Sequence, residues 1–267
     1  AIARSTHLQP RPAQFTHLHR ISRDARLERP SHISLLATNN LKKMKLSQAE
    51  KYAQDPNRQI DEYIEQHSER QPEYLDNVVR ETHLQMINPR MMSGHLQGRI
   101  LKLLVEMTRA RRIIELGTYS GYSALCMAEG LPADGELHTI EIDDELEDFI
   151  REQLQSAPHG NLVHLHIGNA VDIIPQIEGS FDLAFIDADK RLYQQYYDML
   201  LPRMNPGGII LADNTLWDGK VLIDNPAHND HQTIAIKAFN DFIANDSRVE
   251  KVILPLRDGL TLIRVKN

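Results

Sequence analysis

Short apolar runs alternate with helically spaced segments over the second half of the chain. The predicted strands cover residues 112–116, 136–141, 161–166, 182–186, 208–212, 249–254 and 260–265. Helical or mixed segments separate the first five strands, and this alternation is typical of β-α-β units that build a parallel sheet. The last two strands are joined by only a few residues, too few for a crossover helix, so we expect an antiparallel hairpin. The pattern therefore predicts an α/β fold with a doubly wound, mostly parallel sheet of seven strands.

Several helices are predicted before the first strand. Ser47 and Glu50 have the spacing of a capping box, and Pro56 is expected to close the short helix that follows. Further helical stretches lie near residues 58–68 and 73–87. The clearest helix has its apolar positions on one face, at Leu96, Ile100, Leu103, Leu104 and Met107. We expect these helices to cover one side of the sheet.

The first 43 residues have a different character from the rest. They carry eight basic and two acidic residues, a net charge of +6, whereas the whole chain is at −7 and the remainder is therefore at −13. Three interpretations compete: an organelle transit peptide, a basic arm for nucleic acid or an acidic partner, or a tag-like stretch before a natural start at Met44. We divide the chain into a basic leader (1–43) and a single domain (44–267), in which N-terminal helices (44–110) precede the α/β core (111–267).

The overall composition is that of a globular protein. Hydrophobic residues make up 41% and charged residues 25% of the 267 positions, which argues against wholesale disorder. A single cysteine excludes an internal disulfide framework and a Cys-rich zinc site, and we expect a reducing, cytoplasmic location. No run of eighteen apolar residues occurs, so no membrane-spanning helix is predicted.

A glycine-containing turn, ELGTYSGYS, begins at Glu115 and ends at Ser123, directly after the first predicted strand. Gly117 and Gly121 allow a tight turn and let a ligand approach the backbone at the carboxyl end of the strand. Their spacing is not the G-x-G-x-x-G fingerprint of dinucleotide sites, which argues against a pyrophosphate ligand. A purely structural strand-to-helix turn remains the alternative.

Two further positions favour an adenosine ligand. Glu141 ends the second strand, where an acidic side chain can accept hydrogen bonds from both ribose hydroxyls. Asp143 and Asp144 would serve a following helix N-terminus more naturally than Glu141 does. Ala170 follows the third strand, where a small residue lets an adenine ring lie flat. Ribose and base contacts without a pyrophosphate cradle fit S-adenosylmethionine better than NAD.

Acidic and amide side chains follow the fourth and fifth strands. Asp187 comes directly after one strand, and Asp213 and Asn214 follow the next. Neighbouring strand ends converge on one crevice in a doubly wound sheet, so these side chains can meet. Hard oxygen ligands suit Mg²⁺. The alternative is that they cap strands and helices, but two carboxylates brought together without a cation would repel each other.

The motifs MMSGHLQG, IIELGTYSGYSAL, HTIEIDDE, FDLAFIDADK, GGIILADNTLWDGKV and LPLRDGLTLI occur in this order from about Met91 to the C-terminus. Together they resemble the class I S-adenosylmethionine-dependent O-methyltransferases, in particular the cation-dependent branch with caffeoyl-CoA and catechol O-methyltransferases. The resemblance implies a Rossmann-like fold and a homodimer. It covers roughly two thirds of the chain; residues before about 70 match poorly.

The resemblance also implies roles for individual residues. Donor contacts would come from Ser93, Glu115, Gly117, Thr118, Ser123, Glu141, Ala170 and Asp189. The metal would be held by Asp187, Asp213 and Asn214, and Lys190 corresponds to a lysine proposed as general base in the catechol branch. Asp218 matches a substrate-contacting position, and Trp217 before it either forms a wall for an aromatic acceptor or packs. Where the family commonly has Ser-Pro-Glu, this chain has Ser93-Gly94-His95, so acceptor contacts of this helix are expected to differ.

The expected reaction is methyl transfer from S-adenosylmethionine to a hydroxyl of a small phenolic vicinal diol. A competing hypothesis is methylation of a hydroxylated RNA base with the same donor and metal sites, although a body at −13 repels phosphate. A third is a protein that keeps the fold without turnover, against which the intact site residues count.

Other reactive side chains are expected to be structural. His164 and His166 share a strand face at the spacing of a ligand pair, but their distance from the acidic cluster favours a solvated or packed pair. Cys126 lies in an apolar helix and is expected to fill the core. Three tyrosines on one helix, Tyr193, Tyr196 and Tyr197, are expected to pack against the sheet.

Overall fold

The structure is a computed structural model that describes residues 56–267, with side chains from residue 59. The chain divides into two compact units, Ala1–Ile60 and Asp61–Asn267, and the fold below is that of the second unit. The predicted leader and the capping box of Ser47 and Glu50 lie outside the described residues. The first described helix, α2 (Pro56–His67), begins at Pro56.

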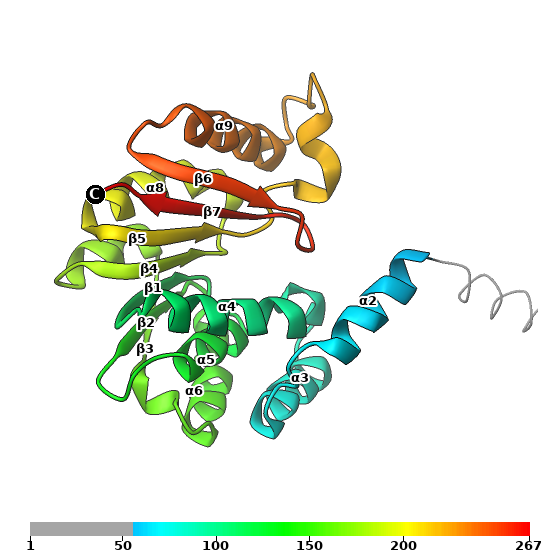
Figure 1. The fold of residues 1–267 in the computed structure, drawn as a ribbon, viewed down its shortest axis with the longest axis vertical. Helices are drawn as coiled ribbons and strands as arrows, with labels where there is room; N and C mark the ends of the chain where they lie inside the picture. Colours follow the sequence, from blue (N-terminus) through cyan, green and yellow to red (C-terminus); the bar gives the residue numbers. More distant parts are fainter. Residues whose placement is uncertain (1–55) are drawn as a thin grey trace, which may run out of the picture. The chain divides into compact units, whose positions relative to one another are not determined.

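Seven strands form one sheet in the order β3-β2-β1-β4-β5-β7-β6 (Figure 1). Their bounds are Arg112–Leu116 (β1), Glu136–Glu141 (β2), Val163–Ile167 (β3), Phe181–Ile186 (β4), Met204–Ala212 (β5), Val249–Leu254 (β6) and Leu260–Val265 (β7). Strands β1 to β5 pair in parallel, and β7 pairs antiparallel with both β5 and β6. The predicted doubly wound sheet with a C-terminal antiparallel hairpin is confirmed.

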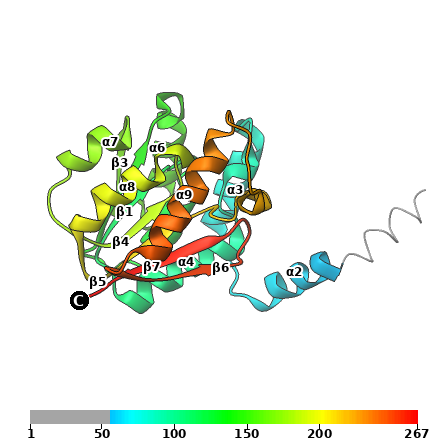
Figure 2. The same ribbon diagram turned by 90° about the horizontal axis from the view of Figure 1, so that it is seen from above.

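Helices cover both faces of the sheet, as Figure 1 and the view from above in Figure 2 show. Their bounds are Glu73–Gln85 (α3), His95–Thr108 (α4), Tyr122–Glu129 (α5), Glu147–Ser156 (α6), Ala170–Ile173 (α7), Tyr193–Leu200 (α8) and His231–Asn245 (α9). One apolar core joins α3, α4, α5 and α6 to the sheet, and a second joins α7, α8 and α9 to the opposite face. Burying apolar side chains on both faces is what a parallel sheet requires.

Short 3₁₀ segments complete the described part of the chain. They are Pro89–Met91 (η1), Asp144–Leu146 (η2), Gly160–Leu162 (η3), Ile174–Gln176 (η4), Lys190–Leu192 (η5), Leu201–Arg203 (η6) and Trp217–Leu222 (η7). The segments η5 and η7 lie a few residues after β4 and β5, and the predicted acidic cluster lies in the two connections between. None of the helices between residues 56 and 267 combines the length and apolarity that crossing a membrane requires.

The predicted apolar face of α4 is wrong. Leu103 is 46% exposed and Met107 76% exposed, whereas Leu101 and Val105 are fully buried. The buried face also carries Gln97, fully buried, and Arg99, 3% exposed. Because polar residues occupy the buried face, the spacing of the apolar residues predicted burial for the wrong side of the helix. Each of these side chains has a partner: Arg99 forms an ion pair with Glu129, and Gln97 Nε2 donates to Asp213. Arg99 Nε and Gln97 Oε1 have no hydrogen-bond partner among the described residues.

The expectations for Cys126 and for the three tyrosines of α8 are confirmed. Cys126 is fully buried in the core that contains α5, and its burial raises the pKa of the thiol to about 12. The three tyrosines of α8 are buried in the second core.

The two histidines of β3 form a packed cluster with His138 of β2. His138 Nδ1 lies 3.0 Å from His166 Nε2, and the rings of His138 and His164 stack with centroids 5.0 Å apart. Burial lowers the pKa of His138 to about 4. The histidines of β3 therefore pack with His138 on the face of the sheet.

Candidate active site

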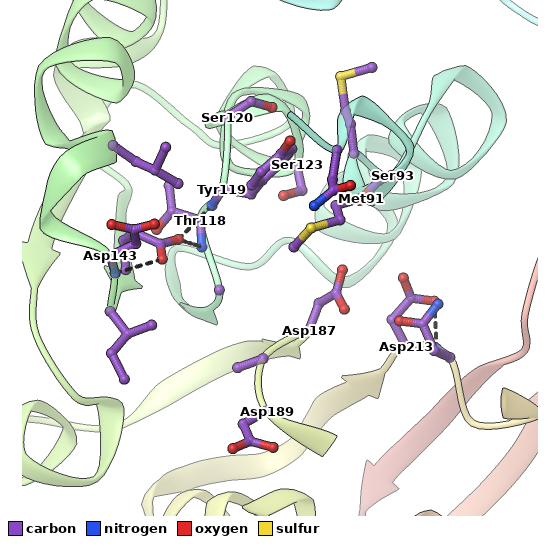
Figure 3. A pocket seen from close by; sticks show the side chains of 18 of the residues that line it. Met91, Ser93, Thr118, Tyr119, Ser120, Ser123, Asp143, Asp187, Asp189 and Asp213 are labelled. Atoms are coloured by element: carbon purple, nitrogen blue, oxygen red, sulfur yellow. Dashed lines mark hydrogen bonds between the residues drawn. The ribbon is translucent and has the colours of Figure 1, made fainter. Parts of the chain in front are cut away.

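A cavity of about 1010 Å³ lies at the carboxyl ends of the parallel strands (Figure 3). It is large enough for a ligand the size of a nucleoside and an additional small molecule. Most residues predicted for the site line it: Ser93, Gly117, Thr118, Ser123, Glu141, Ala170, Asp187, Asp189, Lys190, Asp213, Asn214 and Trp217. Two predicted residues, Glu115 and Asp218, do not.

The glycine turn joins β1 to α5 and forms one wall of the cavity. Gly117 has φ = 93° and Gly121, which precedes the first turn of α5, has φ = 80°. A Cβ at Gly117 would collide with the backbone carbonyl of Asp187. The absence of a side chain there lets the β1 turn lie directly against the end of β4, which brings the two halves of the cavity together.

Glu141 is fixed by the backbone of this turn. Its Oε2 accepts hydrogen bonds from the amides of Thr118 at 3.1 Å and Tyr119 at 2.7 Å, and its Oε1 accepts from the amide of Asp143 at 3.0 Å (Figure 3). A carboxylate has about four lone-pair positions, so three backbone donors leave capacity for a ligand hydroxyl. The carboxylate is thus held in one orientation before any ligand binds.

Glu115 lies beneath the turn. It is fully buried, and its Oε2 accepts from the hydroxyl of Thr139 at 2.6 Å. Burial raises the pKa of Glu115 to about 8, although the hydroxyls of Ser123 and Thr139 oppose the shift. At neutral pH the side chain is therefore mainly protonated, and it supports the turn from below.

Two carboxylates meet at the ends of β4 and β5. Asp213 accepts a hydrogen bond from Gln97 Nε2 at 2.8 Å and another from the backbone amide of Asn214 at 2.9 Å. Burial, and then the charge of Asp187, raise the pKa of Asp213 to about 6. The pair therefore concentrates negative charge at low dielectric, a situation that a bound cation relieves.

The donor set at this point fits a hard divalent cation. Among residues 56–267 no group of three or more His, Cys, Asp and Glu side chains is arranged to hold a metal ion. Asp187, Asp213 and Asn214 instead offer two carboxylates and an amide, which suits Mg²⁺ with further ligands from water and substrate oxygens. Asn214 adopts φ = 57°, an uncommon conformation for a residue other than glycine, which turns the chain sharply after Asp213.

Lys190 lies in the cavity wall and is only 7% exposed. Its Nζ donates to Asp187 Oδ1 at 2.7 Å and to the hydroxyl of Tyr193 at 2.5 Å. A predicted base is therefore in direct contact with a predicted metal ligand.

Asp189 lines the cavity but is already paired. Its carboxylate accepts from the backbone amide and the guanidinium of Arg191, and this pairing lowers the pKa of Asp189. A ligand at this position would share the carboxylate with Arg191.

The end of the cavity beyond β5 contains a strained loop. Trp217 and Asp218 have φ = 49° and 52°. The amide of Asp218 donates to Asp258 Oδ1 at 2.5 Å, and Asp258, rather than Asp218, lines the cavity. The Trp217 ring forms part of the wall, with Lys220 Nζ 5.8 Å from its centroid.

Sequence reasoning missed two residues that contact the acidic cluster, Gln97 and Tyr193. Gln97 precedes Leu101 and Val105 at spacings of four and eight, so the helical repeat of the truly buried face was a usable signal. Tyr193 follows Lys190 by three residues, and this spacing places both side chains on one face only if the segment between them is helical.

Comparison with known proteins assigns residues 65–266 to a family described as O-methyltransferase. Tricin synthase 2 from Oryza sativa subsp. japonica is 38% identical over 184 residues, 65% of this chain and 63% of that protein, so the match spans less than two thirds of it. Catechol O-methyltransferase from Niastella koreensis is 37% identical over 64% of this chain and 80% of that protein.

Solved structures are similar as well. The O-methyltransferase TomG from Streptomyces achromogenes, in complex with SAM, has a TM-score of 0.72 and 30% identity, covering 78% of this chain and 96% of that chain. The O-methyltransferase from Bacillus cereus, in complex with SAH, has a TM-score of 0.72 and 31% identity, covering 78% and 97%.

Proposed function

The chain belongs to the O-methyltransferase family of class I S-adenosylmethionine-dependent enzymes, and we propose that it moves the methyl group of S-adenosylmethionine to one hydroxyl of a phenolic vicinal diol in a metal-dependent reaction. The observation that carries the proposal is that one cavity is lined on two sides by groups suited to two different ligands. The glycine turn and Glu141 form one side, and Asp187, Lys190 and Asp213 form the other.

The turn after β1 and the end of β2 would bind the donor. Glu141 would accept from the ribose hydroxyls, and Gly117 and Thr118 would lie against the rest of the donor. Ala170 leaves room for the adenine ring. The SAM and SAH complexes of the similar structures support this use of the cavity.

Asp187, Asp213 and Asn214 would hold the cation, for which we propose Mg²⁺. When bound, it supplies positive charge that favours the ionised form of an acceptor hydroxyl. A phenol has a pKa of about 10, and lowering it to about 7 corresponds to roughly 4 kcal/mol. Lys190 Nζ lies where it can take the hydroxyl proton or stabilise the oxyanion.

The same walls hold the two reactants in place. Fixing the acceptor oxygen in line with the methyl group and its sulfur removes translational and rotational freedom before the reaction, an effect worth up to about 7–11 kcal/mol in favourable cases. Trp217 provides a flat apolar surface on the acceptor side. The names of the relatives, which include a catechol O-methyltransferase, support an aromatic acceptor.

We extend the proposal to a homodimer and to a cytoplasmic location. Exposed apolar side chains on α4 and on the edge strand β6, among them Leu103, Met107, Val252 and Ile253, support association with a second copy. Sedimentation equilibrium would reveal it, and a concentration-independent monomer mass would refute it. A single, buried cysteine supports a reducing compartment, and localisation of the tagged full-length protein tests it.

The function is tested in two steps. Calorimetry should show that the purified chain binds S-adenosylmethionine; absence of binding would remove the basis for any methyl transfer. A screen of phenolic vicinal diols with Mg²⁺ should then give singly methylated products by mass spectrometry. Total RNA serves as the competing acceptor, and labelled RNA with silent phenols would favour the other substrate class.

A further inference from the structure

Tyr193 lies beneath the acidic cluster, where its hydroxyl contacts three groups. The side chain is fully buried. Its Oη accepts from Lys190 Nζ at 2.5 Å and lies within donating distance of two backbone carbonyls, that of Ile186 at 3.1 Å and that of Asp213 at 3.0 Å. Ile186 ends β4 and Asp213 directly follows β5, so one phenol contacts both strand ends that carry the predicted metal ligands.

Local geometry explains why Tyr193 reaches Lys190. The segment Lys190–Leu192 is a 3₁₀ turn that leads directly into α8, whose first residue is Tyr193. Side chains three residues apart eclipse each other in a 3₁₀ helix. The Lys190 ammonium consequently lies next to the phenol oxygen and 4.8 Å from the ring centroid.

The hydroxyl has one available role toward Lys190. The carbonyls of Ile186 and Asp213 can only accept hydrogen bonds, so the single hydroxyl proton of Tyr193 is directed to them. The oxygen therefore serves as an acceptor toward Lys190.

Two fixed acceptors determine how the lysine nitrogen is oriented. Asp187 Oδ1 and Tyr193 Oη each accept one N–H bond of this nitrogen. With Cε bonded to the nitrogen as well, one tetrahedral position is left that neither acceptor takes. Because Lys190 lines the cavity, the hydroxyl of the methyl acceptor can approach the nitrogen at that position.

We propose that Tyr193 is a positioning residue for the methyl transfer: its hydroxyl orients the amine of Lys190 toward the acceptor and couples it to the ends of β4 and β5. This inference rests on the proposed function. It concerns an interaction through Lys190, since Tyr193 itself does not line the cavity.

The same helix offers a matched control. Tyr197 is also fully buried, and its hydroxyl donates to Asp246 Oδ2 at 2.9 Å, away from the cavity. The rings of Tyr193 and Tyr197 both pack edge-on against Phe239, at centroid distances of 5.6 and 6.3 Å. Replacing either tyrosine by phenylalanine removes one buried hydroxyl and keeps the ring.

The test compares Tyr193→Phe and Tyr197→Phe in the full-length protein, with a radiolabelled donor, a vicinal diol and Mg²⁺. We expect Tyr193→Phe to lower kcat about tenfold, the upper scale of one ordinary hydrogen bond, while KM for the donor stays within about twofold. Tyr197→Phe should lower the melting temperature and leave kcat unchanged. A wild-type kcat in Tyr193→Phe, or an equal loss of kcat in both variants, would overturn the inference.

A double-mutant cycle shows whether Tyr193 acts through Lys190. In a Lys190→Met background, Tyr193→Phe should cause no further loss of kcat. Losses that multiply would mean that the hydroxyl acts independently of the lysine. If Tyr193→Phe does not fold, 4-aminophenylalanine at position 193 replaces it, because its amine is a poor acceptor at the same place. Its loss of kcat must likewise vanish without Lys190, and a persisting loss contradicts the proposal.

Methyl transfer by the parent enzyme and by Tyr197→Phe distinguishes a failure of the proposed function from a failure of the inference about Tyr193. If both transfer methyl groups, and Tyr193→Phe lowers kcat only when Lys190 is present, the proposed function and the inference are both supported. If both transfer methyl groups but the loss in Tyr193→Phe does not depend on Lys190, only the inference is removed. No transfer by either removes the proposed function, and the inference falls with it.

Discussion

The two halves of the cavity satisfy their carboxylates in opposite ways. On the β1–β2 side, Glu141 accepts hydrogen bonds from three backbone amides and is held in place before any ligand arrives. On the β4–β5 side, burial, and then the charge of Asp187, raise the pKa of Asp213 to about 6. The first half holds its carboxylate without a cation, and we propose that the second receives one.

This difference indicates where each half obtains its binding energy. Backbone amides hold the Glu141 carboxylate in place without a counter-cation, and that carboxylate can accept hydrogen bonds from neutral ribose hydroxyls. Two partly buried carboxylates repel each other, and a divalent cation converts that repulsion into attraction. We therefore expect that removing the cation or its ligands lowers the rate of methyl transfer, and that replacing Glu141 lowers the affinity for the donor.

The largest effect is expected from Asp213→Ala. Loss of this carboxylate should lower metal-dependent methyl transfer by about a thousandfold, the equivalent of the roughly 4 kcal/mol assigned to ionisation of the acceptor hydroxyl. Donor affinity, measured by calorimetry, should stay within about twofold. Asp172→Ala, an exposed carboxylate outside the cavity, serves as control and should retain full activity. Loss of donor binding in Asp213→Ala would show that the halves are not separate.

Glu141→Ala should have the converse effect. It removes the expected acceptor of the ribose hydroxyls, and the affinity for S-adenosylmethionine should fall by about 1.5–3 kcal/mol, the scale of a charge-assisted hydrogen bond. At saturating donor, kcat should change far less than in Asp213→Ala. Asp144→Ala is the matched control, because that exposed carboxylate lies at the same strand end but outside the cavity. An unchanged dissociation constant in Glu141→Ala would refute the ribose role.

The smallest effect concerns Glu115 and is read as stability. Its pKa is about 8 in the folded chain, against 4.5 for an ordinary glutamate, so the folded state retains a proton that the unfolded state releases. This contribution to stability is complete below pH 4.5 and declines as the pH rises towards 8, by at most about 1.4 kcal/mol per pH unit. Denaturant titrations should show that Glu115→Gln removes this decline. Parallel pH profiles for the two proteins would mean that the carboxyl is not held protonated.

Local patterns were sufficient to predict most of the sheet. The apolar runs of β1, β2, β6 and β7 gave their observed bounds because each is flanked by residues that end a strand. Strand β5 begins at Met204, four residues earlier than predicted. The prediction began too late because the segment Asn-Pro-Gly-Gly that follows Met204 resembles a turn. The register of β5 with β4 shifts at this point, an irregularity that periodicity does not report.

The strand-end residues of the site were predictable for the same local reason. Asp187 and Asp213 directly follow strands, and topology alone brings neighbouring strand ends together. Gln97 was not predicted, because its hydrogen bond to Asp213 joins residues 116 positions apart and depends on which face of α4 is buried. Tyr193 was predicted only to pack, because its contact with Lys190 requires the 3₁₀ turn that the sequence pattern did not reveal.

The difference between the halves is tested most directly by one sample of the full-length protein, measured with Mg²⁺ and again with excess chelator. In each condition, calorimetry gives the dissociation constant of S-adenosylmethionine, and the radiolabelled donor gives the rate of methyl transfer to a vicinal diol. We predict the same dissociation constant in both conditions and transfer only with Mg²⁺. Transfer that persists in the chelator would contradict the assignment of Asp187, Asp213 and Asn214 to a cation.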